Sequence, residues 1–437
     1  MIIFGLIEYF TFRRWIVQKL STSALNIPRS GIRDVFDRVD AVPDVISLCV
    51  GEPSVTAAPH IVEAACRSIR EGMTTYTNVL GIPEFRAAAA DYTRRVKGLR
   101  YDPDAEVQAV DGATIGLYLA LKAVVDPGDE VVIPAPYFTS YAAEVMLCGG
   151  VPVPVALRPE HGMRVNADDI ASAVTPRTRA VIINSPGNPT GAVTTAAELA
   201  RIGEVCRRHG LWAVSDEVYH PFVFDEDAAA PAAGGTDGAD GAWRPAIPAA
   251  PSIAAVPGMR ERTIIVESLS KTFAMTGWRI GYLLAPAAVI EQTSKIAELM
   301  HSSVNSTAQY GGAAALAGPL DPIVAMREDY RAKRGIVLDG LEGCEALRPT
   351  APQGAFYVFA DVRPTGLDDE TFAERLLREE RVAVVPGRAF GDEGAGFVRL
   401  SYAGDAAELR EGVRRMRAFA ERAAARRTTR RDLAPVA

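Results

Sequence analysis

The chain has 437 residues, 48% of them hydrophobic and 23% charged, and this length favours two domains or one large α/β domain with a smaller partner. Its 47 Lys and Arg and 54 Asp and Glu give a formal net charge of −7, which argues against bulk attraction to nucleic acid or an anionic membrane. The five cysteines (49, 66, 148, 206 and 344) form no CxxC pair. We therefore expect a reducing cytoplasm, no disulfide framework and no metal site.

The first residues, MIIFGLIEYFTF, form the most membrane-like stretch of the sequence. It has about half of the roughly 20 apolar residues that a spanning helix needs, and Glu8 interrupts it. Arg13 and Arg14 follow the apolar run, whereas a signal peptide carries its positive charges before it. We predict that residues 1–27 are an N-terminal extension, packed or frayed or the result of an early translation start. A membrane contact is the alternative.

Predicted helices and strands alternate from Pro59 to about Met300. Apolar spacing and leading Pro or Gly residues predict helices at 59–71, 83–97, 114–125 and 195–209. Short β-branched runs predict strands at 130–135, 179–186, 211–217 and 262–268. This alternation indicates an α/β fold with a largely parallel sheet covered on both faces, in which ligands bind beyond the carboxyl ends of the strands.

Three other regions differ from that pattern. Residues 227–251 are rich in Ala, Gly and Pro with little to bury, which predicts a mobile surface insertion. After residue 318, long helices and predicted strands at 355–360, 382–385 and 397–401 indicate a second, α+β domain. The Arg-rich run 422–431 lacks interleaved aromatic residues, so we interpret it as a solvated helix end rather than a nucleic-acid-binding arm.

A lysine follows directly after a predicted strand, in SLSKTFAMTGWRIGY (268–282). An amine buried at a strand end is costly unless it has a use. A partly desolvated lysine has a lowered pKa, and its neutral amine can form a Schiff base with a carbonyl group. Ser268 and Arg279, on either side of Lys271, supply a hydroxyl and a guanidinium that together suit a phosphate. This combination indicates pyridoxal 5′-phosphate as cofactor.

Two further strand ends carry polar residues that suit the same cofactor. In VSDEVYH (214–220), Asp216 would keep the cofactor's ring nitrogen protonated, so that the ring withdraws electrons. Tyr219, three residues later, could reach the phenolic oxygen of the ring. In NSPGNPTGAV (184–193), Pro and Gly force a turn that projects the Asn188 amide. Each residue alone has a structural explanation, but their shared placement at strand ends favours one site.

These three motifs closely resemble those of the class I/II aminotransferases, the aspartate aminotransferase superfamily of fold-type I enzymes that use pyridoxal phosphate. The resemblance covers roughly residues 28–420, and the lysine motif is its most specific part. It implies a large domain with a mostly parallel seven-stranded sheet and a smaller α+β domain. It also implies a cytoplasmic homodimer with shared active sites, which moves an amino group from an L-amino acid to a 2-oxo acid.

The same resemblance implies roles for individual residues. Lys271 would carry the cofactor as a Schiff base and later shuttle a proton, and Asp216 would pair with the ring nitrogen. Asn188 and Tyr219 would donate hydrogen bonds to the phenolic oxygen. Phe138, in PYFTSY, matches the aromatic residue that stacks on the ring, although core packing would also explain it.

The resemblance also implies phosphate-binding and substrate-binding positions. The phosphate would lie at the N-terminus of a predicted helix, where backbone N–H groups and the helix dipole favour a dianion. The residues matched there are Gly112, Ala113, Thr114, Ser268 and Arg279, with Tyr76 of YTNVLGIPEFR reaching across the dimer interface. Those matched to the substrate's α-carboxylate are Arg399 of FVRLSYA, Gly51 of VGEP and Asn188.

The expected domain division follows from the motifs and the resemblance. It consists of an N-terminal extension (1–27), an arm that joins the small domain (28–58), a large cofactor-binding domain (59–310), a small C-terminal domain (311–425) and a tail (426–437).

The substrate and the reaction type leave alternatives open. Thr114 and Ile115 stand where aspartate-type bacterial relatives often have Lys and Gln, which argues mildly against an aspartate-specific enzyme. The segment Ile27–Arg33 could lie over the site, with Ile32 either contacting substrate or simply packed. Lyases, decarboxylase-type enzymes and cyclopropane-forming synthases use the same residues. A ligand-sensing regulator would need a DNA-binding segment before residue 28, and a cofactor-free binding scaffold is disfavoured because each cofactor position is filled.

Overall fold

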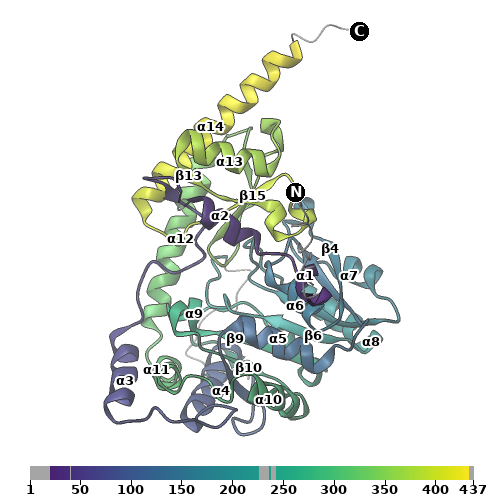
Figure 1. The fold of residues 1–437 in the computed structure, drawn as a ribbon, viewed down its shortest axis with the longest axis vertical. Helices are drawn as coiled ribbons and strands as arrows, with labels where there is room; N and C mark the ends of the chain where they lie inside the picture. The colour runs from purple at the N-terminus through teal and green to yellow at the C-terminus, as the bar shows by residue number, and fades with distance from the viewer. Residues whose placement is uncertain (1–19, 40, 226–235, 238–242, 433–437) are drawn as a thin grey trace, which may run out of the picture.

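The computed structural model describes residues 20–39, 41–225, 236–237 and 243–432 (Figure 1). The predictions for residues 1–12 and for most of the 227–251 insertion lie outside the described residues. Within the described ranges, no helix is long and apolar enough to cross a membrane.

A seven-stranded sheet forms the centre of the larger part, in the order β2-β10-β9-β6-β5-β3-β4. All of its strands are parallel except β10, which runs antiparallel to both of its neighbours. The strands are β2 (Val107–Val110), β3 (Glu130–Ala135), β4 (Val151–Ala156), β5 (Thr178–Asn184), β6 (Trp212–Asp216), β9 (Thr263–Ser268) and β10 (Gly281–Leu284). The predicted α/β fold with a mostly parallel seven-stranded sheet is therefore confirmed.

Helices cover both faces of this sheet, because alternate strand residues carry apolar side chains to opposite sides. Val214 and Val266 pack towards α5, whereas Ile265 and Tyr282 pack towards α4. On the α5 side lie α5 (Ala113–Val124), α6 (Ser140–Leu147) and α10 (Ala287–His301); on the other side lie α4 (Pro83–Lys97), α7 (Ala167–Ala173) and α8 (Ala196–His209). Around them are α3 (Pro59–Arg70), α9 (Leu269–Thr272) and α11 (Ser306–Ala317).

A smaller, four-stranded antiparallel sheet lies in the upper half of Figure 1, in the order β11-β12-β15-β14. Its strands are β11 (Arg348–Pro349), β12 (Tyr357–Asp361), β14 (Val385–Pro386) and β15 (Phe397–Ser401), and its helices are α12 (Asp321–Leu341), α13 (Asp369–Glu380) and α14 (Ala406–Asp432). Short 3₁₀ helices are η1 (Pro159–His161), η3 (Ile253–Ala255), η4 (Arg260–Arg262), η5 (Thr276–Trp278), η6 (Arg363–Thr365), η7 (Gly387–Phe390) and η8 (Asp392–Gly394).

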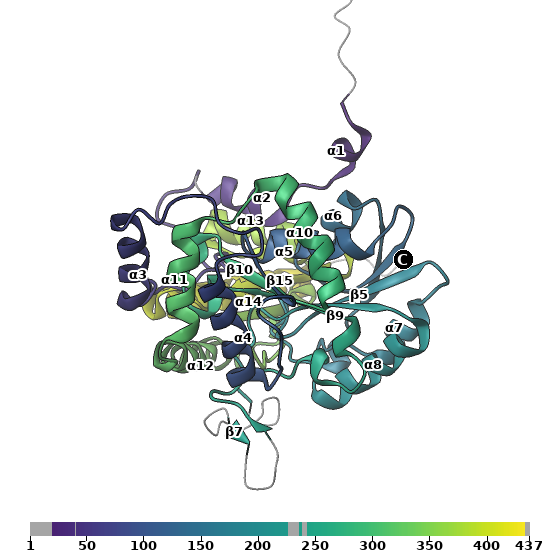
Figure 2. The same ribbon diagram turned by 90° about the horizontal axis from the view of Figure 1, so that it is seen from below.

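The N-terminal segment packs on this C-terminal part. The strand β1 (Ile46–Ser47) pairs in parallel with β13 (Val382–Ala383), and α2 (Gly31–Val39) lies against η7. A Cβ atom on Gly31 would stand 2.7 Å from the Cβ of Ala389, so a glycine allows α2 to approach η7 closely. The short helix α1 (Thr22–Asn26) has no buried residue and stands away from the body of the molecule (Figure 2).

Three predicted boundaries differ from the structure. The predicted strand 382–385 is divided into β13 and β14, because β13 pairs with β1 and β14 with β15. The surface insertion does not extend to residue 251, because Ile247, Ala249 and Ala250 are at most 5% exposed. The two strands described within the predicted insertion, β7 (Thr236–Asp237) and β8 (Trp243–Arg244), form a hairpin that projects from the body (Figure 2). The helix α14 continues to Asp432, past the boundary expected at 425.

Candidate active site

A cavity of about 250 Å³ lies beyond the carboxyl ends of β5, β6 and β9. It collects eleven of the predicted site residues from segments far apart in the chain. They are Gly51, Ala113, Thr114, Phe138, Asn188, Asp216, Tyr219, Ser268, Lys271, Arg279 and Arg399. Gly112 adjoins this set through Arg279, whereas Tyr76 is 87% exposed and does not line the cavity.

Lys271 lies in the single turn of α9, which begins directly after β9 ends at Ser268. Its Nζ donates a hydrogen bond to the backbone oxygen of Gly51 at 2.5 Å, and no described carboxylate forms an ion pair with it. Burial lowers the pKa of Lys271 from 10.5 to about 8. A substantial fraction of the amine is therefore neutral, and so nucleophilic and basic, at moderately alkaline pH.

Asp216 is the last residue of β6, and its side chain turns into the cavity. Burial raises its pKa from 3.8 to about 6. Two donors oppose that effect by stabilising the ionised form: the hydroxyl of Tyr141, 2.6 Å from Oδ2, and the backbone N–H of Val218, 3.3 Å from Oδ1. Asp216 is thus a carboxylate that a nearby positive charge would readily ionise.

Arg399, on β15, is only 1% exposed. Its Nη2 donates to the backbone oxygen of Cys49 at 2.6 Å and its Nη1 to Asn188 Oδ1 at 3.1 Å. Its Nε has no hydrogen-bond partner, and no described carboxylate pairs with the guanidinium. A buried cation in this state is costly unless a bound anion neutralises it.

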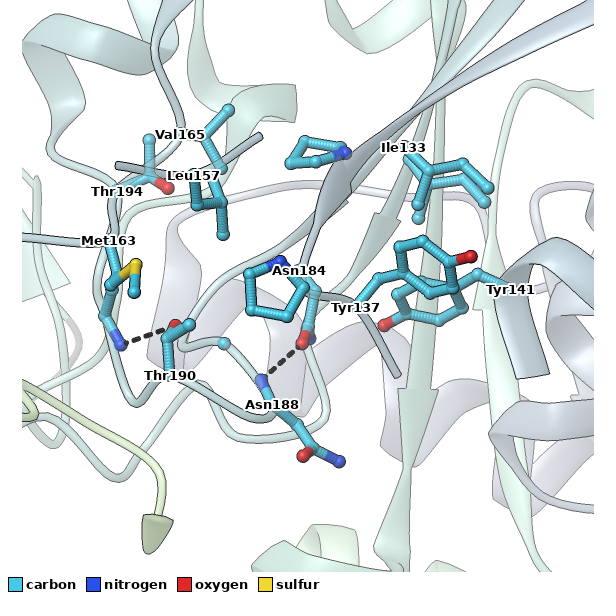
Figure 3. A pocket seen from close by; sticks show the side chains of 15 residues that line it. Ile133, Tyr137, Tyr141, Leu157, Met163, Val165, Asn184, Asn188, Thr190 and Thr194 are labelled. Carbon is cyan, nitrogen blue, oxygen red and sulfur yellow. Dashed lines mark hydrogen bonds between the residues drawn. The ribbon is translucent and has the colours of Figure 1, made fainter. Parts of the chain in front are cut away.

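The turn that carries Asn188 is fixed by Asn184 at the end of β5. The backbone N–H of Asn188 donates to Asn184 Oδ1 at 2.8 Å, and Figure 3 shows this bond above the projecting Asn188 side chain. Behind the turn lies a small pocket of about 20 Å³, which shares Tyr141, Asn184 and Asn188 with the main cavity. The amide of Asn188 is therefore held at the cavity wall, as the sequence predicted.

The opposite end of the cavity suits a phosphate group. Gly112 precedes α5 with a φ of 81°, and a Cβ there would stand 2.5 Å from Arg279 Nη2. Glycine thus lets the guanidinium approach the N-terminus of α5, where backbone N–H groups point outward. Ser268 lines the cavity beside it, with its hydroxyl 2.8 Å from that of Ser270.

Several cavity residues were not found from the sequence. The hydroxyl of Tyr357 lies 2.9 Å from that of Tyr219, and its ring lies 4.5 Å from Arg399 Cζ. Tyr141 bonds Asp216, and its ring makes an edge contact with Phe138 at 5.7 Å. Phe36 lines the cavity from α2. The spacing of PYFTSY could have suggested Tyr141, but no local signal marks Phe36 or Tyr357.

Together with the order of the sheet strands, this site defines a fold-type I enzyme that uses pyridoxal 5′-phosphate. The cofactor fits three features of the cavity: the partly neutral Lys271 amine, the Arg279 guanidinium at the N-terminus of α5, and the acid Asp216. The amine of Lys271 suits the cofactor's carbonyl carbon, the guanidinium of Arg279 suits its phosphate, and the carboxyl group of Asp216 suits its protonated ring nitrogen.

Comparison with known proteins identifies the family. The chain matches the family model "Aminotransferase class I and II" over residues 43–416. It is 38% identical to an arginine–pyruvate transaminase of Pseudomonas aeruginosa, over 87% of this chain and 91% of that protein, and 38% identical to an aromatic-amino-acid aminotransferase of Thermococcus litoralis, over 89% and 94%. The solved structure of an aspartate aminotransferase from Thermus thermophilus with maleate superposes with a TM-score of 0.83 at 34% identity, covering 92% of this chain and 100% of that one.

The chain therefore belongs to the class I and II aminotransferases. It is a pyridoxal-phosphate-dependent enzyme that moves an amino group between an amino acid and a 2-oxo acid. The matched relatives favour transamination over the lyase and decarboxylase alternatives. The substrates for which these relatives are named differ from one to another, so the substrate of this chain depends on its own residues.

Proposed function

We propose that this cavity accepts L-amino acids with apolar side chains as amino donors. The observation that carries the proposal is the distribution of charge in the cavity. The cations that line it are Lys271, Arg279 and Arg399, and each has a use at the cofactor or at the α-carboxylate. The wall contributed by α2 is apolar and consists of Ile32 and Phe36. A charged substrate side chain would lose its hydration there without gaining a partner from these residues.

The residues would hold the cofactor at three points. Arg279, Ser268 and the N-terminus of α5 would bind the phosphate, and Asp216 would bind the ring nitrogen. Tyr219 would donate to the phenolic oxygen, as would the amide N–H₂ of Asn188, whose oxygen accepts from Arg399. The bound cofactor supplies a carbonyl carbon for the substrate amine and a ring that withdraws electrons from the substrate's Cα.

Two residues act on the substrate directly. Arg399 would bind its α-carboxylate through a planar pair of N–H donors, which also fixes the direction of the Cα–H bond. Lys271, once displaced from the cofactor, would take the Cα proton and return it to the cofactor's side. Its pKa of about 8 suits a base that must be neutral before each transfer.

The active unit we propose is a homodimer. Met73, Tyr76, Leu299 and Met300 are between 41% and 91% exposed, which leaves an apolar surface uncovered on one chain. A hydrogen bond of 3.4 Å from Thr77 N to Ser303 Oγ holds the Tyr76 loop beside the end of α10. A second copy would cover this surface, and its Tyr76 would reach the phosphate. All five cysteines are unpaired thiols, which supports a reducing compartment such as the cytoplasm.

Steady-state kinetics with a panel of donors test the substrate class. We expect kcat/KM for L-leucine or L-methionine to exceed that for L-aspartate or L-lysine by at least about tenfold. Phe36→Ala should lower kcat/KM for leucine by about tenfold and leave that for alanine, which is too short to reach Phe36, nearly unchanged. A preference for aspartate, or an equal loss with both substrates, would contradict the proposal.

A further inference from the structure

A buried ionic cluster lies on the face of the large sheet that α4 covers, away from the cavity. Lys97, the last residue of α4, has a side chain only 2% exposed, and its Nζ donates to Glu217 Oε2 at 2.5 Å and also to Glu267. His220 Nδ1 lies 3.3 Å from Glu267 Oε1, and its Nε2 lies 2.9 Å from the hydroxyl of Tyr92. These five residues are called the Lys97 cluster.

The two acids of the cluster are chain neighbours of active-site residues. Glu217 follows Asp216 directly, and Glu267 precedes Ser268 directly. The strands β6 and β9 are adjacent, with Asp216 opposite Val266, so both pairs lie at the same edge of the sheet. Successive residues of an extended chain point to opposite sides of the sheet. Asp216 and Ser268 therefore face the cavity, whereas the neighbouring acids Glu217 and Glu267 face the side that α4 covers.

Lys97 supplies one positive charge against the two carboxyl groups of the cluster. Burial lowers the pKa of Lys97, but attraction to Glu217 and Glu267 raises it by more, so the amine stays charged. Glu217 is further held by the hydroxyls of Ser215 and Ser252, each 2.7 Å from Oε1. The charges of Glu267 and Glu217 both act to raise the pKa of Asp216, after the larger effect of burial. Without Lys97, the charges of two buried carboxylates would act on the Asp216 carboxylate with no cation beside them.

We propose that Lys97 is a positioning residue for transamination: it pairs with Glu217 and Glu267 on the rear of the sheet and offsets part of their negative charge, and so keeps Asp216 ionised and in place for the cofactor's ring nitrogen. This rests on the proposed role of Asp216. Lys97 itself lies on the other side of the strand end and acts through Asp216.

Other titratable groups act on Asp216, but none can replace Lys97. They are Tyr141 and Glu144 of α6, Glu267 of β9, Lys271 of α9, Tyr219 and Tyr357. Burial raises the pKa values of the three tyrosines and of Glu144, so the charged form of each of these groups is disfavoured. Lys271 becomes neutral during the reaction, whereas Lys97 stays charged throughout.

The test compares full-length variants by cofactor titration of the apoenzyme over a range of pH and by kcat and KM of the holoenzyme. The variants are Lys97→Met, Glu267→Gln, the double variant and Asp216→Asn. Lys333→Met is the matched control, because Lys333 has a side chain only 8% exposed that pairs with the single carboxylate of Asp329 at 2.6 Å, in the separate helix α12.

In Lys97→Met, we expect the cofactor affinity to fall at least about tenfold near neutral pH, and the pH below which affinity is lost to rise by about one unit. The kcat should fall, while KM for the amino acid stays nearly constant because Arg399 is unchanged. Adding Glu267→Gln should restore affinity and kcat to within about threefold, because one cluster acid is then neutral. Equal behaviour of Lys97→Met and Lys333→Met, or no rescue in the double variant, would overturn the proposal.

Glu267→Gln alone decides the question if Lys97→Met does not fold, since Lys97 still pairs with Glu217 in that variant. Glu267→Gln should lower the pH below which cofactor affinity is lost, and an unchanged value of that pH would contradict the proposal. Asp216→Asn distinguishes a failure of the role of Asp216 from a failure of the role of Lys97. If that variant binds cofactor and turns over normally, the proposed role of Asp216 fails; if it is inactive while Lys97→Met is normal, only the role of Lys97 fails.

Discussion

The cavity and the Lys97 cluster are both buried and both charged, yet they differ in how their charges are paired. In the cluster, Lys97 contacts two carboxylates, and His220 forms a hydrogen bond with the hydroxyl of Tyr92. In the cavity, neither Lys271 nor Arg399 has a carboxylate partner, and Arg399 Nε has no partner at all. Since the two regions lie on either side of the same strand ends, the sheet cannot explain the difference.

This difference in charge pairing indicates which of the two regions binds a ligand. Burying an unpaired charge costs far more than burying a hydrogen-bonded pair, so an unpaired cation persists only where another molecule supplies the anion. On the proposed roles, the cavity would supply binding energy for a carboxylate and a phosphate, whereas the paired charges of the Lys97 cluster would stabilise the fold behind it. Substitutions on the two sides should separate activity from stability.

The largest effect should come from Lys271→Ala. This variant should still bind the cofactor, because the phosphate and ring contacts remain, but it loses the group that moves the proton. Positioned acid–base catalysis contributes about 10²–10⁴-fold, so kcat should fall by at least that amount. Turnover assays at cofactor saturation measure it. Normal turnover in this variant would exclude Lys271 from the reaction.

Arg399→Leu should mainly lower kcat/KM, whereas Lys97→Met should mainly lower the free energy of unfolding. Losing the carboxylate-binding guanidinium in Arg399→Leu should lower kcat/KM by about 10²–10³-fold, through loss of a paired, charge-assisted hydrogen bond. The free energy of unfolding of the cofactor-free protein should change by less than about 1 kcal/mol, because an unpaired buried charge is removed. Lys97→Met should instead cost about 3–5 kcal/mol, because it strands two buried carboxylates. Denaturant unfolding measures both values, and equal losses would contradict the comparison.

Tyr141→Phe should have a smaller effect that depends on pH. The Tyr141 hydroxyl stabilises the ionised form of Asp216 and so lowers its pKa, and removing it should raise that pKa further above about 6. A hydrogen bond to a charged group contributes about 1.5–3 kcal/mol, so cofactor affinity should fall by at least about tenfold at low pH. The loss should shrink as the pH rises and Asp216 ionises. A loss independent of pH would contradict this role.

The smallest effect concerns Tyr76. Tyr76→Phe should weaken cofactor binding by a few-fold, about the value of one hydrogen bond. When Tyr76→Phe and Lys271→Ala subunits are mixed, one site in each heterodimer carries neither defect if Tyr76 acts across the interface. Activity and cofactor affinity of that site should then return to the wild-type values. No recovery, with heterodimers present, would count against shared sites.

Local patterns predicted those cavity residues that stand at or just after strand ends, whereas the other predicted cavity residues were matched through the family resemblance. The β-branched runs placed Lys271 after β9 and Asp216 at the end of β6, and the sheet brings them into one cavity. Arg399 was matched only through a resemblance, since nothing within FVRLSYA reveals that its side chain would be buried and unpaired.

Contacts between distant segments could not be predicted. The pairing of Lys97 with Glu217 and Glu267 depends on the end of α4 meeting β6 and β9, and no local pattern encodes that meeting. The burial of Ile247 could not be predicted either, because Ile247 lies in an Ala/Pro-rich stretch. The backbone N–H of Ala246 donates to the backbone oxygen of Arg95 in α4, and this contact holds the stretch against the core. The dimer contact of Tyr76 stays a prediction.

A single half-reaction shows whether the enzyme transaminates and whether it takes an apolar donor. Holoenzyme is mixed with L-leucine and no acceptor, the visible absorption of the bound cofactor is followed, and the products are identified by mass spectrometry. We expect loss of that absorption with one equivalent of the 2-oxo acid that keeps the whole leucine skeleton, and no reaction of comparable rate with L-aspartate. Release of CO₂, or a fast reaction with aspartate and none with leucine, would contradict it.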